Sequence, residues 1–446
     1  MMNRTYIQSK LKKNVLVQTL HTFFVYFQAK SFLNKKSIWT DLQKREMTHI
    51  LQYAQEHCFY YRNILENSKI NQDNVLSILE TMPLLDKSII HEQGKRIYSD
   101  EISDNWKSWL NTGGSTGNPL KFPALYKGRH FEMLNQMMLY MKMGYKLGDK
   151  IAAIAGNRVT DEKLEKHQYW NYETNFPYGF LRLSTLYLDD QTVGYYFGVL
   201  NQKKPAFIRG YPSGVMDLCK LGKKYNLSIN YKIKGIYLTS ENFSQDEKNF
   251  IKSFFKCPVF GQYGHTESSI FAIQLPDESY YYCSPLYGYT EVLDEKGDHV
   301  PEGGKGEVVV TGFIEYGLPF IRYKTGDLAV YGGKNNNGVV VLKELLGRNV
   351  DFIFDKSGKK IYLVGFIFGG HIHAFDYIQS WQIEQNEIGC IELKVVKLTG
   401  YDETVELEIK ELFERNGVKV KFTYVNKIEK TIRGKQKFLI QNIKAN

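Results

Sequence analysis

Residues Asn111–Phe122 read NTGGSTGNPLKF, a stretch that combines three glycines with hydroxyl, amide and lysine side chains. A backbone without β-carbons can turn several N–H groups toward one point, and the hydroxyls of Thr112, Ser115 and Thr116 add donors beside them. Lys121 supplies a cation nearby. The stretch therefore predicts a loop that holds phosphate oxygens, although a glycine-rich surface turn without a ligand explains the same composition when the stretch is taken alone.

Four further stretches occur downstream in a fixed order. They are GQYGHTE at 261–267, RYKTGD at 322–327, GRNVD at 347–351 and RGKQKF at 433–438. Together with TGGSTGNPLK they closely resemble the ordered core motifs of the adenylate-forming superfamily, which contains acyl-CoA and aryl-CoA synthetases, luciferases and nonribosomal peptide adenylation domains. Within it the chain resembles the phenylacetate-CoA ligase-like branch, and there the subgroup encoded with bacterial capsule and surface-polysaccharide genes.

The fold expected from this resemblance is α/β, with a large N-terminal adenylate-forming domain of helix-covered sheets and a small mobile α+β C-terminal domain. The chain of 446 residues exceeds the size of one core, and short β-rich runs alternate with helical patterns along it. We expect an N-terminal domain for ATP and the acyl substrate at 1–346, with a helical segment at about 38–95, and a lid domain at 347–446.

The activity that the resemblance implies is that of an AMP-forming acid–thiol ligase. Such an enzyme activates a small carboxylic acid with ATP and Mg²⁺ to an acyl-adenylate, releases pyrophosphate, and then transfers the acyl group. Coenzyme A is the first acceptor to consider. An amine or hydroxyl of a sugar is an alternative acceptor, and nucleotide binding without catalysis is an alternative function. The aromatic segment 156–188 is either part of the acyl pocket or an ordinary core.

The nucleotide site is expected to draw on most of the motifs. In the glycine-rich loop, Thr112, Ser115, Thr116 and Gly117 would hold the β- and γ-phosphates by resemblance. Lys121 departs from the superfamily pattern, in which lysine often follows the proline directly, because Leu120 intervenes. The full set of expected nucleotide-binding residues is Thr112, Gly114, Ser115, Thr116, Gly117, Lys121, Ser240, Glu241, Gly261, Tyr263, Asp327 and Arg348.

The motif GQYGHTE carries two of the three expected catalytic residues. Tyr263 offers a flat apolar face for adenine, Thr266 a hydroxyl for the α-phosphate, and Glu267 a carboxylate for Mg²⁺. His265 either acts on the substrate carboxylate or makes a structural hydrogen bond.

Lys435 is the third expected catalytic residue. In the superfamily the matching lysine swings into the site on the small domain and neutralises charge at the α-phosphate. The resemblance also implies that Asp327 and Arg348 hold the ribose hydroxyls and that Asp351 lies near the hinge between the domains. A basic C-terminal tail that only aids solubility is the alternative for Lys435.

The amino-acid composition favours one cellular compartment and certain kinds of binding partner. The five cysteines are scattered without a Cys-x-x-Cys pair, which argues against a disulfide framework and a structural zinc site and favours the cytoplasm. Cys283 has no histidine close to it in the sequence. The net charge of +10 favours anionic partners, but its lysines and arginines form no nucleic-acid-binding signature.

The first 36 residues place apolar side chains at helical spacing between basic ends. Polar residues such as Gln18, Thr22 and Gln28 interrupt the apolar run, so the segment is too polar to span a bilayer. It could lie in a membrane interface, which would make the protein peripheral to a membrane, or pack on the body as an ordinary helix. The apolar positions are Leu16, Leu20, Phe23, Phe24, Phe27 and Phe32.

Overall fold

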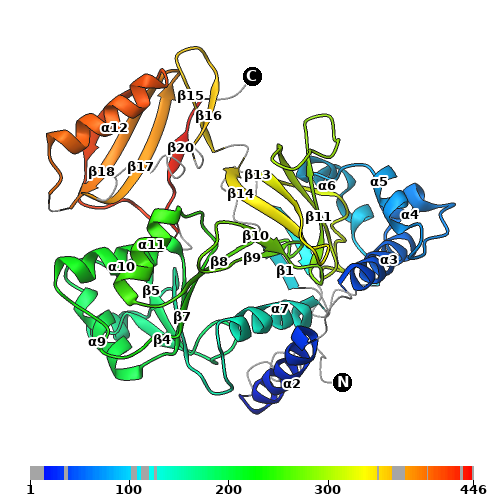
Figure 1. Cartoon of the computed structure of the whole chain (residues 1–446), viewed down its shortest axis with the longest axis horizontal. Helices are drawn as coiled ribbons and strands as arrows, with labels where there is room; N and C mark the ends of the chain where they lie inside the picture. The colour runs from blue at the N-terminus through cyan, green and yellow to red at the C-terminus, as the bar shows by residue number, and fades with distance from the viewer. Residues whose placement is uncertain are drawn as a thin grey trace. The chain divides into compact units, whose positions relative to one another are not determined.

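Figure 1 shows a computed structural model of the chain, which describes residues 15–34, 39–101, 108–111, 120–124, 128–348, 351–363, 377–398, 400–431 and 435–443. Contacts group the chain into two compact units. The first unit joins Met1–Gly148 to Gly261–Glu344, and the second joins Asp149–Phe260 to Leu345–Asn446. The expected boundary between 346 and 347 stays a prediction, because the C-terminal residues are grouped here with a middle segment of the chain.

Helices occupy most of the N-terminal part of the first unit. Asp86 begins one of them as an N-cap, since its side chain accepts a hydrogen bond from the backbone N–H of Ile89. The helices are α2 (Val15–Asn34), α3 (Trp39–His57), α4 (Phe59–Leu65), α5 (Val75–Thr81), α6 (Lys87–Gln93), the 3₁₀ turn η1 (Gly94–Ile97) and α7 (Gly128–Lys142).

The sheet of the first unit has the strand order β11-β12-β13-β14-β10-β9-β8. The pairs β11–β12, β12–β13, β10–β14, β9–β10 and β8–β9 are antiparallel. A separate hairpin pairs β1 with β2 on either side of the glycine-rich loop. The strands are β1 (Ser108–Asn111), β2 (Lys121–Ala124), β8 (Val259–Gly264), β9 (Phe271–Gln274), β10 (Tyr281–Cys283), β11 (Gly288–Leu293), β12 (Lys305–Gly312), β13 (Tyr323–Lys334) and β14 (Val340–Arg348).

A buried arginine joins the helical part of this unit to its sheet. Arg322 donates to both oxygens of Glu291, at 3.0 and 3.3 Å, and to the backbone carbonyls of Glu80 and Met82, each at 3.0 Å. Its own carbonyl accepts from the N–H of Leu85 at 2.9 Å. The guanidinium therefore pairs with one buried carboxylate and two backbone carbonyls, which offsets the cost of removing these groups from water.

The second unit contains a parallel sheet covered by helices. Strands β5, β3, β6 and β7 are parallel neighbours, and β4 pairs antiparallel with β5 at the edge. Its core includes buried side chains from the strands and from the helices between them. The elements are β3 (Ile151–Ala155), α8 (Asp161–Glu165), β4 (Trp170–Tyr172), β5 (Leu181–Ser184), η2 (Thr185–Tyr187), α9 (Val193–Lys203), β6 (Phe207–Gly210), α10 (Pro212–Lys224), β7 (Gly235–Thr239) and α11 (Gln245–Phe255).

The C-terminal part of the second unit is a small α+β structure. Its sheet has the order β19-β18-β17-β20, and α12 covers one face of it (Figure 1). The elements are β15 (Phe352–Phe354), β16 (Lys360–Tyr362), β17 (Ile378–Glu387), β18 (Cys390–Lys397), α12 (Glu403–Arg415), β19 (Lys419–Tyr424) and β20 (Leu439–Gln441). The helix-covered sheets and this small α+β structure confirm the expected fold class.

Replacing Arg322 with alanine should destabilise the first unit by about 3 to 5 kcal/mol, because the buried carboxylate of Glu291 loses its counter-charge. Urea unfolding of the full chain, followed by tryptophan fluorescence, measures the change. Arg45→Ala is the control, since its ion pair with Glu46 is largely exposed and contributes about 0 to 1 kcal/mol. Equal shifts in the two variants would show that Arg322 does not anchor the unit.

Candidate active site

Glu267 lies buried in the turn that follows β8, in the first unit. Its Oε1 accepts a hydrogen bond from the hydroxyl of Tyr323 at 3.0 Å, and its Oε2 lies 3.0 Å from Nδ1 of His265. Gly264 precedes the turn, where an added β-carbon would lie 2.9 Å from the carbonyl oxygen of Ile270. Glycine is required there because any side chain would push the turn away from β9.

The charge of His265 decides the ionisation of Glu267. Burial alone would raise the pKa of the Glu267 carboxyl, but the charge of His265, whose Nδ1 lies 3.0 Å away, lowers it to about 2. The carboxyl is therefore an anion at neutral pH. Within the described part of the chain, no hydrogen bond reaches Nε2 of His265.

Tyr263 and Asp327 come from different strands and meet in the same unit. The Tyr263 hydroxyl donates to Oδ2 of Asp327 at 2.7 Å. Burial, together with the Asp327 charge, raises the pKa of Tyr263 well above its ordinary value. The structure thus brings together the residue expected at adenine and one of the residues expected at ribose.

A bulge in β13 places Asp327 beside Tyr263. Leu328 pairs with Glu307 and Lys324 pairs with Val309, so 325–327 lie opposite a single residue of β12. Gly326 has φ of +77°, a conformation that glycine adopts without strain. The bulge re-aims the side chain that follows it, which explains why Thr-Gly precedes the aspartate in RYKTGD.

The glycine-rich loop lies outside the described residues, and with it Thr112, Gly114, Ser115, Thr116 and Gly117. The strand that follows the loop is connected to the Glu267 network through rings in edge-to-face contact. Phe122 on β2 contacts Phe320 with ring centroids 5.2 Å apart, and Phe320 contacts Tyr323 at 4.9 Å. Lys121 is exposed, with its ammonium 5.3 Å from the centre of the Trp109 ring.

In the second unit, Lys435 lies at the end of β7. Its Nζ donates to the backbone carbonyl of Ser240 at 2.9 Å and lies 5.3 Å from the centre of the Tyr211 ring. Ser240 has φ of +74°, a conformation that costs a non-glycine residue about 1 to 3 kcal/mol. Such strain is common at functional sites, so Ser240 and Lys435 together mark a candidate site.

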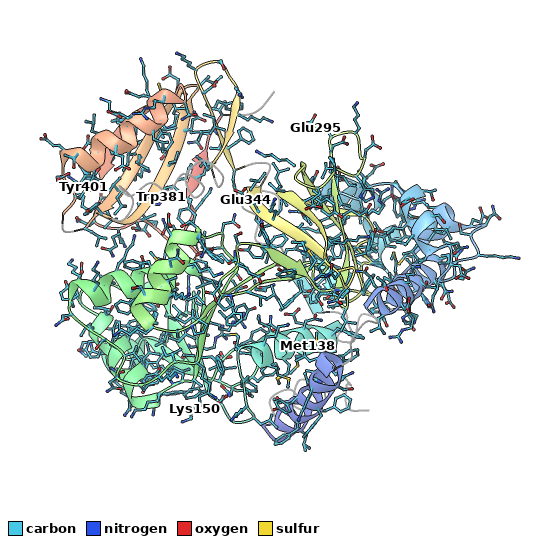
Figure 2. The ribbon with its side chains drawn as sticks, in the orientation of Figure 1. Met138, Lys150, Glu295, Glu344, Trp381 and Tyr401 are labelled. Carbon is cyan, nitrogen blue, oxygen red and sulfur yellow. The ribbon has the colours of Figure 1, made fainter. Side chains whose placement is uncertain are left out.

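Glu241 connects the turn that contains Lys435 to the start of α10. Its carboxylate accepts from the N–H of Ser213 at 3.0 Å and from the N–H of Gln436 at 3.2 Å. Burial raises the pKa of Glu241, and these donors and the Lys435 charge oppose that rise. Gln436 also donates to the carbonyl of Trp381 on β17, which is labelled in Figure 2.

A second contact in this unit involves residues that the motifs did not indicate. Lys430 donates to the carboxylate of Asp217 at 2.9 Å and to the carbonyl of Thr185 at 3.1 Å, and the pair is mostly buried. Nothing in the sequence distinguishes Lys430 from its basic neighbours. Tyr323 was also missed, although its position inside RYKTGD could have indicated it.

The remaining expected residues lie in or next to strands of the same sheet. Gly261 is a buried residue of β8, and Thr266 lies in the turn before Glu267. Arg348 ends β14, and its carbonyl accepts from the N–H of Asp351 at 3.0 Å. In the aromatic segment, Phe176 is buried while Tyr172 and Tyr178 are exposed, so only part of that segment serves the core.

In the ranges that the structure describes, no group of three or more histidine, cysteine, aspartate or glutamate side chains could hold a metal ion by itself. None of the helices in those ranges combines the length and hydropathy that crossing a bilayer requires. The roles expected for the motif residues in nucleotide binding, catalysis and hinge motion stay predictions.

Comparison with known proteins gives three similarities. The CapK C-terminal domain family matches residues 353–442. Protein CapK of Staphylococcus aureus is 24% identical, over 97% of this chain and 96% of that protein. A crystal structure of 2-hydroxyisobutyryl-CoA ligase in the postadenylation state superposes with a TM-score of 0.68, at 18% identity, over 90% of this chain and 89% of that chain.

A more distant relative matches a smaller part. The D-alanine–D-alanyl carrier protein ligase of Streptococcus agalactiae is 26% identical over 33% of this chain and 32% of that protein. The chain is thus similar to ligases along much of its length, and its C-terminal segment is similar to the CapK C-terminal domain.

Acid should remove the stabilisation that ionised Glu267 provides. Because its pKa is about 2 in the folded protein and 4.5 ordinarily, this stabilisation is complete above about pH 5 and is lost as the pH falls toward 2. The lowered pKa corresponds to about 3 kcal/mol. Thermal unfolding midpoints measured between these pH values should fall more steeply in the natural protein than in Glu267→Gln.

The control for this titration is Glu295→Gln, at an exposed carboxyl in the loop between β11 and β12, which Figure 2 labels. That variant should follow the natural protein. Parallel curves for all three proteins would contradict a lowered pKa at Glu267.

The order of the motifs, the fold and the similarity to CapK over nearly the whole chain all agree with one another. Together they support the expected resemblance of the chain to the adenylate-forming superfamily.

Proposed function

We propose that this protein activates a small carboxylic acid with ATP to give an acyl-adenylate and pyrophosphate, and then transfers the acyl group to an acceptor. The observation that carries the proposal is the buried, ionised Glu267, held by His265 and Tyr323 within the motif that the superfamily resemblance assigns to the activated phosphate. The fold and the similarity to acyl-CoA ligases support it.

In the first step, a carboxylate oxygen of the acid attacks the α-phosphorus of ATP. A carboxylate–phosphorus bond forms while the bond to the pyrophosphate oxygen breaks, so the electron pair leaves with pyrophosphate and no proton is transferred. Negative charge is redistributed over the phosphoryl oxygens, and the site must supply donors and cations there. No covalent nucleophile of the protein is needed.

The residues at Glu267 fit a magnesium ion. Mg²⁺ is usually bound by one or two carboxylates together with substrate phosphates, and the Glu267 carboxylate is an anion at neutral pH. When bound, the ion would draw charge from the phosphate oxygens. The protein's own contribution is orientation, because Tyr323 and His265 each hold one oxygen of the carboxylate.

Lys435 would neutralise charge at the α-phosphate. Its ammonium is the end of a side chain whose backbone is held by Thr431, which donates its N–H to the Lys435 carbonyl at 2.9 Å and accepts from the Lys435 N–H at 3.1 Å. Asp327 and Arg348 would bind ribose and Tyr263 the adenine. His265, with Nε2 directed at no described partner, would contact the substrate carboxylate.

Coenzyme A is the first acceptor to test. A structure of 2-hydroxyisobutyryl-CoA ligase in complex with its acyl-AMP and CoA has a TM-score of 0.54 to this chain, at 19% identity. The resemblance to the capsule and surface-polysaccharide subgroup keeps the amine or hydroxyl of a sugar as the second acceptor. Incubation of the activated acid with CoA or with amino sugars, followed by mass spectrometry of the acylated product, separates the two.

Exchange of labelled pyrophosphate into ATP should occur with at least one member of a panel of aryl, short-chain, hydroxy and amino acids. Lys435→Ala should lower the exchange rate about 100-fold or more, because one donor at a developing charge is lost. Lys437→Ala, at an exposed lysine two residues away, should leave the rate unchanged. Tight ATP binding without exchange for any acid would favour the non-catalytic alternative.

Tyr323→Phe should raise the Mg²⁺ concentration needed for half-maximal exchange by about 10-fold, because one oxygen of Glu267 loses its orienting donor. Titration of the exchange rate with MgCl₂ measures the shift. Tyr331→Phe, farther along β13, is the matched control and should not change it. If both variants had the same half-maximal concentration as the natural protein, Tyr323 would not orient the metal ligand.

A further inference from the structure

Helix α2 lies alongside α7 (Figure 1). Val25 and Ala29 of α2 are fully buried. His130 on α7 is 2.7 Å through Nε2 from the side-chain oxygen of Gln28, and its Nδ1 lies 3.2 Å from Nε2 of His21. These polar contacts fix which side of α2 meets the protein.

The rest of α2 exposes four large apolar side chains, of which Phe24 lies at the edge, with its ring centroid 5.7 Å from that of His130. Leu20, Phe23, Phe24 and Phe27 are 62%, 43%, 61% and 60% exposed. Their spacing of i, i+3, i+4 and i+7 places them on one face of the helix, which we call the aromatic face. A contiguous exposed apolar patch of this kind marks an interaction site more often than a scattered surface residue does.

The sequence that contains the aromatic face is strongly basic. Residues 1–36 contain seven lysines and arginines and no aspartate or glutamate, so this segment supplies +7 of the chain's net charge of +10. The remaining 410 residues supply only +3. The basic residues are Arg4, Lys10, Lys12, Lys13, Lys30, Lys35 and Lys36.

We propose that the aromatic face of α2 binds the surface of an anionic lipid bilayer, with the helix lying in the interface. Phenylalanine and leucine side chains bury among acyl chains without requiring hydrogen-bond partners, and basic residues on both flanks are attracted to anionic headgroups. The polar residues Gln28 and His21 on the opposite side are engaged with α7, so insertion of the aromatic face leaves them in place.

Charge complementarity selects lipid over a second copy of the chain. A symmetric dimer through the aromatic face would set the same basic segment of both subunits against itself, bringing +7 toward +7. An anionic bilayer offers an opposite charge and an apolar layer together. An acidic protein would offer the opposite charge without a continuous apolar layer. Binding to such a protein is one outcome of the test below.

The test uses the full chain and vesicles of phosphatidylcholine with and without phosphatidylglycerol, in a flotation assay at low and high salt. At low salt, the fraction of the natural protein that floats should be at least about 10-fold larger with vesicles that contain phosphatidylglycerol than with phosphatidylcholine alone. Much of this difference should be lost at high salt. Replacing Leu20, Phe23 and Phe27 together with glutamine should reduce binding about 10-fold or more. Replacing Lys10, Lys12 and Lys13 together with glutamine should abolish the preference for anionic vesicles.

Matched controls separate this face from general surface properties. Replacing the exposed apolar residues Phe59, Ile388 and Leu407 with glutamine should leave flotation unchanged. Replacing the exposed lysines Lys356, Lys359 and Lys410 with glutamine should also leave it unchanged. Circular dichroism and the unfolding midpoint of each variant, matched to the natural protein, establish that lost binding is not lost folding.

Three outcomes would overturn the proposal. The natural protein could fail to bind anionic vesicles, or it could bind them equally after either triple replacement on α2. It could instead form a dimer in sedimentation experiments that the apolar triple variant does not form, which would make the aromatic face a subunit interface. Binding to poly-glutamate without binding to vesicles would point to an acidic protein partner and would equally contradict the proposal.

Discussion

The buried guanidinium of Arg322 is the contact on which most of the first unit depends. It lies at the start of the RYKTGD motif, and it satisfies Glu291 on β11 together with two carbonyls at the end of the segment that carries α5. Removing water from these charged and polar groups is costly unless all of them are paired, so the arginine leaves little freedom in how this strand meets the helical segment. Arg322 itself has φ of +46°, which shows that its backbone yields to the demands of the contact.

The position of Arg322 constrains the positions of the residues that follow it along β13. Tyr323, the next residue, reaches the carboxylate of Glu267, and Asp327, after the bulge, reaches Tyr263. Phe320, just before it, packs on Phe122 beyond the glycine-rich loop. This stretch therefore positions a candidate metal ligand, a candidate ribose ligand and the strand after the glycine-rich loop. An active site that stabilises charge without a covalent nucleophile needs this kind of prior order, because its groups must already point at the reacting phosphate.

In the second unit, the candidate site residues are held by ion pairs and backbone hydrogen bonds. The turn of Lys435 is held at β7 by the carboxylate of Glu241 and by backbone contacts, and the nearby ion pair of Lys430 with Asp217 is mostly buried. Ion pairs and backbone hydrogen bonds can be exchanged for other polar contacts more readily than an apolar core can be repacked. In the superfamily that the chain resembles, the matching segment takes part in two reaction steps. The aromatic face of α2 adds a separate surface, and acyl activation next to a bilayer would bring the product close to membrane-bound acceptors.

The sequence by itself indicated the resemblance to the adenylate-forming superfamily, and it predicted the fold class and the positions of several elements. The stretch that begins at Ser244 carries its own capping box with Glu247, and the strand at 151–155 is marked by an apolar run, so both could be predicted from local pattern. The tertiary structure decided which distant residues meet. Tyr323 and Glu267 are 56 residues apart, and Lys430 and Asp217 are 213 apart. For α2 the helical spacing was visible, but both sides of the helix carry apolar residues, and only the contact with α7 decided which side is buried. Local sequence specifies the conformation of an element, whereas the partner of each side chain depends on how the elements pack.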